Sequence, residues 1–402
     1  MTEELLYDWN FARSRRRIPP GFSLLDETLR DGIQSPSVRN PSIEEKLELL
    51  HRMEECGIEC ADVGLPGAGA QAVADVTRLV QEVRDQRMAL RPNCAARTHV
   101  HDVTAVVDIS QKVGHPVEVC TFVGCSPIRR LVEGWDLAKL ERLVVDAVSL
   151  AVRHGLPTTF VTEDTTRTDP TTLSKLYRAA VDNGATRIVL TDTVGHATLE
   201  GLENLVTFVR WVLESMGASH VRLDWHGHSD RGLALALCLA ALELGVDRVH
   251  GTCLGIGERV GNAPIDLLLI NLKLLGVIDR DLRGLCGYVR QASQAFGVEI
   301  PCNYPVFGRD AFRTATGVHA AAILKALQAG RRDLADRVYS AVPASDFGRS
   351  QEIEVGFYSG KANILHWLQE HQLEPTEERV AAIWQAAKSS PATLTEQQIW
   401  EV

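Results

Sequence analysis

Two histidines, His226 and His228, lie at the end of an apolar run in this chain of 402 residues. Side chains at positions i and i+2 of a strand point to the same face. The pair can therefore hold one metal ion, or it can consist of structural histidines that form hydrogen bonds. A mixed metal site also needs hard oxygen donors. We expect Asp31 to supply a carboxylate and Asn262 to supply a carbonyl oxygen.

Arg30 directly precedes Asp31 and is the second residue with evident chemical use. A fixed guanidinium beside a metal ion stabilises negative charge that develops on a carbonyl or enolate oxygen. The alternative is a structural ion pair between Arg30 and Asp31 or a neighbouring acid. Gln34 is either a hydrogen-bonding partner of a substrate or a cap for the next turn.

From residue 22 onward, short apolar or β-branched runs alternate with helical patterns. The runs are Phe22–Leu29, Ile58–Val63, Ala89–Ala95, Val117–Val123, Thr158–Val161, Arg187–Leu190, Val221–Trp225 and Arg248–Cys253. The helical segments include Ile43–Glu55, Leu137–Arg153, Thr171–Asn183 and Leu233–Leu244. Eight βα units of roughly 30 residues each predict an α/β fold, a (β/α)8 TIM barrel. An open doubly wound sheet is disfavoured, because no Gly-x-Gly-x-x-Gly turn follows the first run.

The expected domain organisation is an N-terminal arm (1–20), the barrel (21–278) and a small, mainly helical C-terminal region (279–402). Helical patterns in the last region cover Asp279–Phe296, Gly317–Gln328, Ala362–His371 and Thr376–Lys388. In a (β/α)8 barrel, function lies at the C-terminal ends of the strands. Polar residues follow six of the eight predicted strands, which favours a site there.

The composition is that of an ordinary globular protein, with 45% hydrophobic and 23% charged residues. A net charge of −10 argues against nucleic acid as a partner. The basic run Arg13–Arg17 is interpreted as a solvated or subunit-contacting arm. We expect no membrane span and no secretory leader. Nine scattered cysteines without a Cys-x-x-Cys pair indicate reduced, mostly core-filling thiols in a cytoplasmic protein.

Three ordered motifs, Asp26–Gln34, His226–Gly232 and Gly255–Ala263, resemble those of the DRE-TIM metallolyase superfamily. Within it, the chain is similar to the branch of 2-isopropylmalate, homocitrate and citramalate synthases, over roughly residues 22 to 370. The resemblance implies a Claisen-type condensation of acetyl-CoA with a 2-oxo acid. It also implies a divalent metal (Zn, Mn or Mg) on Asp31, His226 and His228, with Asn262 close by or ligating.

The same resemblance implies roles for further residues. Arg30 neutralises the developing alkoxide, while His319 acts as acid or base with help from Glu163. Tyr339 helps to activate water. In this branch the histidine reaches the active site of the partner subunit in a homodimer; a helix-packing histidine and a core tyrosine are the alternatives. We expect acetyl-CoA near the glycine-rich loop, at the residues Gly255, Gly257, Glu258 and Arg259.

The chain departs from the pattern of this family at several positions that bear on acceptor specificity. Thr159 stands where homocitrate synthases have an arginine that binds the distal carboxylate of 2-oxoglutarate. A threonine cannot form this ion pair, so homocitrate synthase activity is disfavoured. Arg97 and His99 nevertheless resemble the Arg-x-His of the homocitrate branch. Arg129, in a loop after the fourth strand, either binds a distal anion or is a surface arginine. Thr193 is a further candidate for substrate contact.

Two smaller departures concern positions outside the acceptor site. Ser229 stands where the family commonly has asparagine, which would alter a hydrogen bond behind the metal ligands. The chain also lacks the extra C-terminal domain that gives leucine feedback, so we expect no inhibition by leucine.

Three functions are therefore weighed. The first is the condensing enzyme just described, and the second is a retro-aldol or retro-Claisen lyase of the same superfamily. The third is a non-catalytic barrel that serves as a binding or regulatory module. His319 and its helical region favour the first function, and the intact set around Arg30 and Asp31 argues against the third.

Overall fold

The structure is a computed structural model that describes residues 5–11 and 18–402. The basic run Arg13–Arg17 lies outside the described residues. The chain divides into two compact units. Of the described residues, one unit comprises 18–280 and 287–299, and the other comprises 5–11, 281–286 and 300–402.

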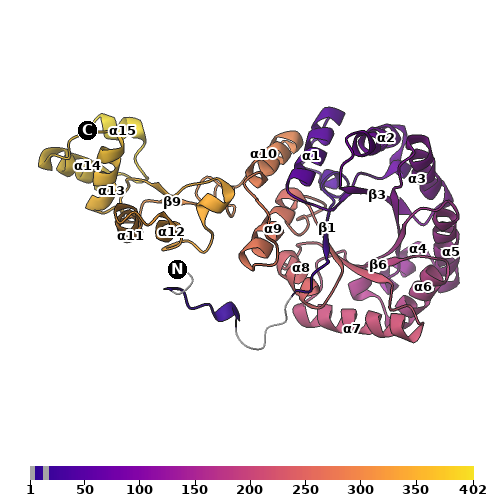
Figure 1. Ribbon diagram of the computed structural model, residues 1–402. Helices are drawn as coiled ribbons and strands as arrows, with labels where there is room; N and C mark the ends of the chain where they lie inside the picture. The colour runs from indigo at the N-terminus through magenta and orange to yellow at the C-terminus, as the bar shows by residue number, and fades with distance from the viewer. Residues whose placement is uncertain (1–4, 12–17) are drawn as a thin grey trace. The chain divides into compact units, whose positions relative to one another are not determined.

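The first unit is a closed barrel of eight parallel strands in sequence order, which confirms the predicted (β/α)8 fold (Figure 1). The strands are β1 (Ser23–Asp26), β2 (Cys60–Asp62), β3 (Arg91–Arg97), β4 (Glu118–Gly124), β5 (Thr158–Glu163), β6 (Arg187–Asp192), β7 (Arg222–Gly227) and β8 (Arg248–Gly251). β8 pairs with both β1 and β7. Barrel closure thus brings the ends of β1 and β7 within one strand of each other.

Helices follow the strands and surround the barrel (Figure 1). They are α1 (Ile43–Glu55), α2 (Ala70–Asp85), α3 (Val100–Val113), α4 (Pro127–Glu133), α5 (Leu137–Arg153), α6 (Pro170–Asp182), α7 (Leu199–Ser215), α8 (Ala234–Glu243), α9 (Ile265–Leu274) and α10 (Leu285–Phe296). Side-chain caps define several of their starts. Ser42 and Glu45 form a reciprocal capping box at α1, and Asp136 caps α5.

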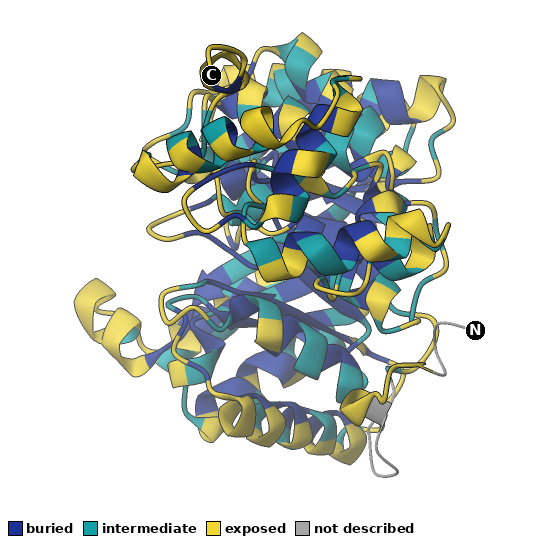
Figure 2. Ribbon diagram, turned by 90° about the vertical axis from the view of Figure 1, so that its left-hand side faces the viewer, coloured by how far each residue is buried: buried dark blue, intermediate teal, exposed yellow. Residues whose placement is uncertain are grey.

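Burial follows the layers of the barrel, with buried strands and helices that are exposed on their outer faces (Figure 2). The burial pattern of β6, whose last five residues are all buried, is typical of a strand covered on both faces. α7, in contrast, alternates buried and exposed positions, because only one stripe of a helix faces a core. Apolar burial between these layers is the main stabilising contribution.

Short single-turn 3-10 helices occupy several connections at the C-terminal ends of the strands. They are η3 (Gly32–Gln34), η4 (Pro66–Ala68), η5 (Thr165–Arg167) and η6 (Cys253–Gly255). They lie in the connections after β1, β2, β5 and β8, so they help to position the residues beyond these strands at the barrel mouth.

The second unit is mainly helical, as predicted. Its elements are η2 (Trp9–Phe11), β9 (Arg313–Thr314), α11 (Gly317–Gln328), α12 (Arg332–Ala335), η7 (Ala344–Phe347), β10 (Glu352–Ile353), α13 (Lys361–Glu370), α14 (Glu377–Ser389) and α15 (Glu396–Trp400). Its core includes Ile364, Trp367, Leu368 and Ile383. The helix predicted over Asp279–Phe296 begins only at Leu285; Asp279 and Arg280 belong to the barrel unit.

Seven of the nine cysteines are buried, as the sequence predicts for core-filling thiols. Among the described residues, no helix has the length and apolar character needed to cross a membrane.

Candidate active site

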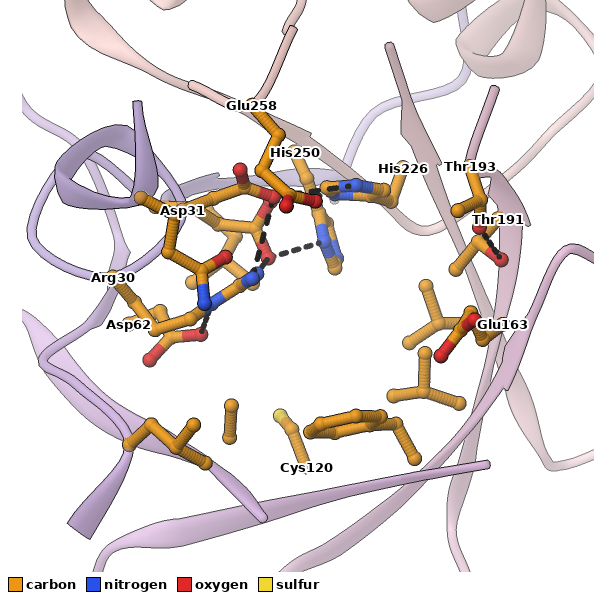
Figure 3. A pocket seen from close by; sticks show the side chains of 18 of the residues that line it. Arg30, Asp31, Asp62, Cys120, Glu163, Thr191, Thr193, His226, His250 and Glu258 are labelled. Atoms are coloured by element: carbon orange, nitrogen blue, oxygen red, sulfur yellow. Dashed lines mark hydrogen bonds and ion pairs between the residues drawn. The ribbon is translucent and has the colours of Figure 1, made fainter. Parts of the chain in front are cut away.

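A cavity of about 280 Å³ opens at the C-terminal ends of the barrel strands (Figure 3). It is lined by Leu25, Glu27, Arg30, Asp31, Gln34, Asp62, Leu65, Ala95, Cys120, Phe122, Val161, Glu163, Val189, Thr191, Thr193, His226, His228, His250 and Glu258. These residues come from every strand of the barrel or from the connection that follows it. Their convergence at this end is what the (β/α)8 fold leads us to expect of an active site.

Asp31, His226 and His228 meet at one side of this cavity. The Nε2 atoms of both histidines lie 3.7 Å from Oδ2 of Asp31. The three side chains are buried, and their ligand atoms lie within 4.8 Å of one another. Oδ1 of Asp31 and Nδ1 of His228 are buried without a hydrogen-bond partner. Buried polar atoms are normally satisfied, so this donor set fits a divalent metal ion.

The charge states of these groups also suit a metal. Burial and the neighbouring His226 lower the pKa of His228 to about 4, which keeps its imidazole neutral. Burial would raise the pKa of Asp31, but Arg30 and the two histidines outweigh it and hold that pKa below its usual value. A neutral imidazole and an ionised carboxylate are the forms that bind metal.

Glu27 orients the metal-facing nitrogen of His226. Its Oε2 lies 2.6 Å from Nδ1 of His226. A carboxylate accepts, so Nδ1–H of His226 donates and Nε2 is left as the ligand atom beside Asp31. Glu27, His226 and His250 also form a possible ligand group. We favour the group with Asp31, because Glu27 already accepts hydrogen bonds from His226 and Arg30.

Asn262 lies against this cluster at the end of the glycine-rich loop. Its Nδ2 donates to the Ile256 carbonyl at 3.2 Å, and its Oδ1 is buried without a partner. Gly257 makes the approach possible: a Cβ atom there would lie 2.2 Å from Nδ2 of Asn262. Gly261 is equally constrained, since its Cβ would lie 1.8 Å from the Gly255 carbonyl oxygen.

Arg30 is fixed by three carboxylates. Its Nη2 donates to Glu27 at 2.7 Å, its Nη1 to Asp31 at 3.2 Å and its Nε to Asp62 at 2.8 Å. Burial raises the pKa of Asp62 to about 6, although Arg30 opposes this shift. The guanidinium is thus held rigidly in the cavity wall beside the proposed metal ligands, as Figure 3 shows. This arrangement is compatible with both predicted roles of Arg30, the stabilisation of negative charge on a substrate oxygen and a structural ion pair.

Glu163 ends β5 and lines the cavity on the side away from Arg30 (Figure 3). Burial and the nearby carboxylates of Asp164 and Glu258 raise its pKa, while Arg129 lowers it. The next residue, Asp164, has a φ of 63°, a left-handed conformation that is uncommon for a non-glycine residue. Thr193 accepts a hydrogen bond from the Asp164 amide at 2.8 Å and helps to hold this turn.

Other predicted contact residues reach the cavity. Gln34, Thr193 and Glu258 line it. Arg259 does not line it; this side chain donates to Asp230 at 2.9 Å and to the carbonyl of the lining residue Thr193 at 2.6 Å. Gly255 is positioned by the loop and is not a lining residue.

Four predicted acceptor-binding residues are not brought to the cavity wall. The Arg97 side chain is 59% exposed and forms an ion pair with Asp102 at 2.6 Å. His99 is exposed at the start of α3, where its Nδ1 accepts a hydrogen bond from an amide. Arg97, the last residue of β3, is held away from the cavity by Asp102 in the first turn of α3.

Thr159 and Arg129 complete this group. Thr159 is buried deeper in the barrel, two residues before Val161, and donates to Glu118 at 2.5 Å. Arg129 lies on α4, with Nη2 3.2 Å from Glu133 and Nε 3.9 Å from Glu163. Arg129 does not line the cavity, but its positive charge lowers the pKa of Glu163.

His319 and Tyr339 belong to the second unit. Their rings stack with centroids 3.9 Å apart, and both side chains are exposed. The structure thus brings these two predicted catalytic residues together on one surface.

Sequence reasoning assigned no role to several residues of the cavity. Glu27, Asp62 and His250 carry charge or hydrogen bonds there, while Cys120, Phe122, Val161 and Val189 contribute apolar surface. The two-residue alternation along strands was an available signal. Val161 precedes Glu163 by two, and Glu27 is two residues beyond Leu25, so each pair faces inward.

The sequence is similar to those of two kinds of named synthase. It is 32% identical over 376 residues to "Homocitrate synthase AksA" of Methanopyrus kandleri, covering 92% of this chain and 88% of that one. It is 29% identical over 372 residues to "2-isopropylmalate synthase" of Sediminispirochaeta smaragdinae, covering 90% of this chain and 70% of that one.

Solved structures agree on the fold. Hydroxymethylglutaryl-CoA lyase of Pseudomonas aeruginosa has a TM-score of 0.58 and 19% identity, covering 69% of this chain and 93% of that one. HMG-CoA lyase of Brucella melitensis has a TM-score of 0.57 and 16% identity, covering 69% of this chain and 99% of that one. Residues 21–286 match the family model described as HMGL-like. On this match and these relatives, the chain belongs to the HMGL-like family.

Proposed function

We propose that this protein condenses acetyl-CoA with a 2-oxo acid in the barrel cavity and releases CoA and a 2-hydroxy-2-carboxymethyl acid. The observation that carries the proposal is one cavity that joins the Asp31–His226–His228 cluster, the fixed guanidinium of Arg30 and the carboxylate of Glu163. The names of the relatives support it, since homocitrate and 2-isopropylmalate synthases are enzymes of this kind.

The first chemical step needs a base and stabilisation of an enolate, because the methyl proton of acetyl-CoA is very weakly acidic. We assign this proton transfer to Glu163, and its raised pKa and its place in the cavity wall support the role. The resulting carbanion attacks the keto carbon of the 2-oxo acid and forms the new C–C bond. Water then cleaves the thioester, which leaves a carboxylate and the CoA thiol.

Arg30 supplies positive charge where the keto oxygen becomes an alkoxide. Its three hydrogen bonds hold it in place, so little reorganisation is needed during the reaction. A divalent ion on Asp31, His226 and His228 supplies Lewis-acid polarisation of the keto group when bound. Zn, Mn and Mg all remain compatible with this mixed donor set.

The roles of the second unit rest on the resemblance and on the stacked pair. His319 is proposed as an acid or base and Tyr339 as a residue that activates water. We further propose a cytoplasmic homodimer in which these residues reach the partner's cavity. The exposure and stacking of both rings support a role at a surface that receives a ligand or a partner.

Acceptor-dependent release of free thiol from acetyl-CoA tests the function. The assay uses the metal-supplemented full chain and a panel of 2-oxo acids, with product identified by mass. We expect stoichiometric thiol and hydroxy acid with at least one acceptor. The lyase alternative predicts instead cleavage of hydroxymethylglutaryl-CoA, and a binding module predicts neither reaction.

A further inference from the structure

His250 lies in the cavity wall but belongs neither to the favoured ligand set nor to the groups that perform the proposed chemistry. On β8 it follows Arg248 by two residues, and alternate residues of a strand share a face. Asp224 and His226 form a pair of the same spacing on the neighbouring strand β7. Asp224 is in register with Arg248, so His250 lies in the same layer of the barrel as His226.

Three contacts hold the His250 side chain in this layer. Its Nε2 lies 3.1 Å from Oδ2 of Asp224 and donates there, since a carboxylate only accepts. Its Nδ1 lies 3.3 Å from Oε1 of Glu27. Its ring meets the ring of His226 edge to face, with centroids 5.7 Å apart. The side chain is 4% exposed, so the packed interior leaves it little room for another rotamer.

Asp224 is a firm anchor for this imidazole. Its Oδ2 also accepts a hydrogen bond from Nε of Arg248 at 2.6 Å, and its Oδ1 pairs with Arg187. Arg248 in turn donates to both carboxylate oxygens of Glu118 on β4. Asp224 and Arg248 are almost fully buried. Such a layer stays in place, because breaking one buried pair leaves an uncompensated charge.

Glu27 links His250 to the groups that the proposed function uses. Its Oε2 accepts a hydrogen bond from Nδ1 of His226 at 2.6 Å, and its Oε1 accepts one from Arg30 at 2.7 Å. His250 approaches the same Oε1 atom and lies next to His226 at this edge of the cavity (Figure 3). The Glu27 carboxylate is therefore held between Arg30, His226 and an imidazole that is anchored from below.

We infer that His250 is a positioning residue of this site: anchored on Asp224, it holds Glu27 so that His226 presents its Nε2 atom to the ion. The inference rests on the metal site of the proposed function. The effect of His250 passes through Glu27, and partners that orient a metal-bound imidazole change metal affinity by roughly 10- to 100-fold.

Two variants of equal shape isolate the contact with Glu27. His250→Asn places an amide nitrogen near the position of Nδ1, where it can donate to Glu27, whereas His250→Leu has no polar atom there. Both variants lose the hydrogen bond to Asp224, so they differ only in the contact with Glu27. Thr162→Val is the control, because it removes a buried, hydrogen-bonded hydroxyl on β5 that does not line the cavity.

Titration of the metal-free full chain with Co²⁺ measures the dissociation constant, and the visible absorption of the bound ion reports the geometry of its ligands. Every variant should bind about one equivalent. We expect His250→Leu to weaken Co²⁺ binding roughly tenfold and to change the absorption spectrum, while His250→Asn stays within about threefold of the wild type. Thr162→Val should lose stability to denaturant without a change in affinity or spectrum.

Wild-type affinity in His250→Leu would overturn the inference. An equal loss in both His250 variants would also overturn it, and is the result expected if His250 is itself a ligand together with Glu27 and His226. A wild-type chain that binds no Co²⁺ would overturn the inference and remove the metal from the proposed function. The expected Co²⁺ binding without thiol release from acetyl-CoA would remove the condensation and leave the role of His250 in place.

Discussion

At the scale of single residues, neighbouring charges set the position and the protonation of the groups around the cavity. Arg30 and Glu163 illustrate two opposite cases. Three carboxylates fix Arg30, so its charge is permanent and its position is rigid. Glu163 has a raised pKa because burial and like charges disfavour its ionised form. A fixed cation and a tunable base are what deprotonation of a weak carbon acid requires.

Arg30→Ala should lower kcat by roughly 100- to 1,000-fold, because a preorganised charge at the reacting oxygen is lost. The fold and the metal content should be retained, as judged by circular dichroism and elemental analysis. Arg30→Lys is the matched control, because it keeps the positive charge but lacks the planar guanidinium that binds three carboxylates. Its kcat should lie between that of the wild type and that of Arg30→Ala. Near-normal turnover in Arg30→Ala would refute the assigned role.

The pH profile of kcat/KM should report Glu163. A base acts in its deprotonated form, so the rate should fall as pH drops through the pKa of Glu163, above the 4.5 of an ordinary glutamate. Glu258→Gln removes a charge that raises this pKa and should move the acid limb to lower pH. Arg129→Ala removes a charge that lowers it and should move the limb to higher pH. An acid limb that neither variant moves belongs to another group.

At the scale of elements, the loop after β8 holds Asn262 against the cluster of Asp31, His226 and His228 through close backbone approach. Two of its non-glycine residues, Leu254 and Arg259, also adopt positive φ values of 58° and 55°. Such conformations persist only where the surrounding structure determines them. The glycines of this loop are thus required by space and by backbone geometry.

Gly261→Ala should destabilise the protein much more than Gly276→Ala. Both positions have positive φ, but a Cβ at Gly276 meets nothing within 4 Å, whereas one at Gly261 meets the Gly255 carbonyl at 1.8 Å. The Gly276 variant should therefore lose about 1 kcal/mol, and the Gly261 variant at least about 2 kcal/mol more. Denaturant unfolding measures both, and equal losses would show that the loop relaxes freely.

The elements were largely predictable from the sequence, because the alternation of apolar runs and helical patterns carries a strong signal. α1, α5 and α11 have the predicted bounds. Strands β5, β6 and β7 run two residues beyond their predicted ends, since polar side chains such as that of Glu163 mask the strand pattern at the barrel mouth. Closure of the barrel made the meeting of Asp31 with His226 and His228 predictable.

The positions of the Arg97 and Thr159 side chains could not be predicted in this way. Whether an arginine faces a substrate depends on which acid reaches it in the folded chain, and here Asp102 does. Likewise, the hydroxyl of Thr159 donates a hydrogen bond to Glu118 of β4 instead of facing the cavity. Such choices of partner are tertiary, and no local pattern encodes them.

At the scale of the whole molecule, the proposed homodimer has a consequence that a single subunit would not show. Mixing Arg30→Ala chains with His319→Ala chains should restore activity, if His319 acts in the partner's cavity. Each hybrid dimer then has one site with an intact Arg30 and an intact His319. Activity should rise above that of either variant alone after the two chains are unfolded and refolded together. No recovery would show that His319 acts within its own chain or has no catalytic role.

Asp31, His226 and His228 are proposed to hold one divalent ion, and the content of divalent metal per chain measures this. The wild-type protein, reconstituted and freed of excess ion, should hold about one equivalent, since the three ligand atoms converge on one position. His228→Ala should lose it, whereas His250→Ala, which alters the competing group with Glu27, should keep most of it. Full metal content in His228→Ala, or loss confined to His250→Ala, would contradict the account.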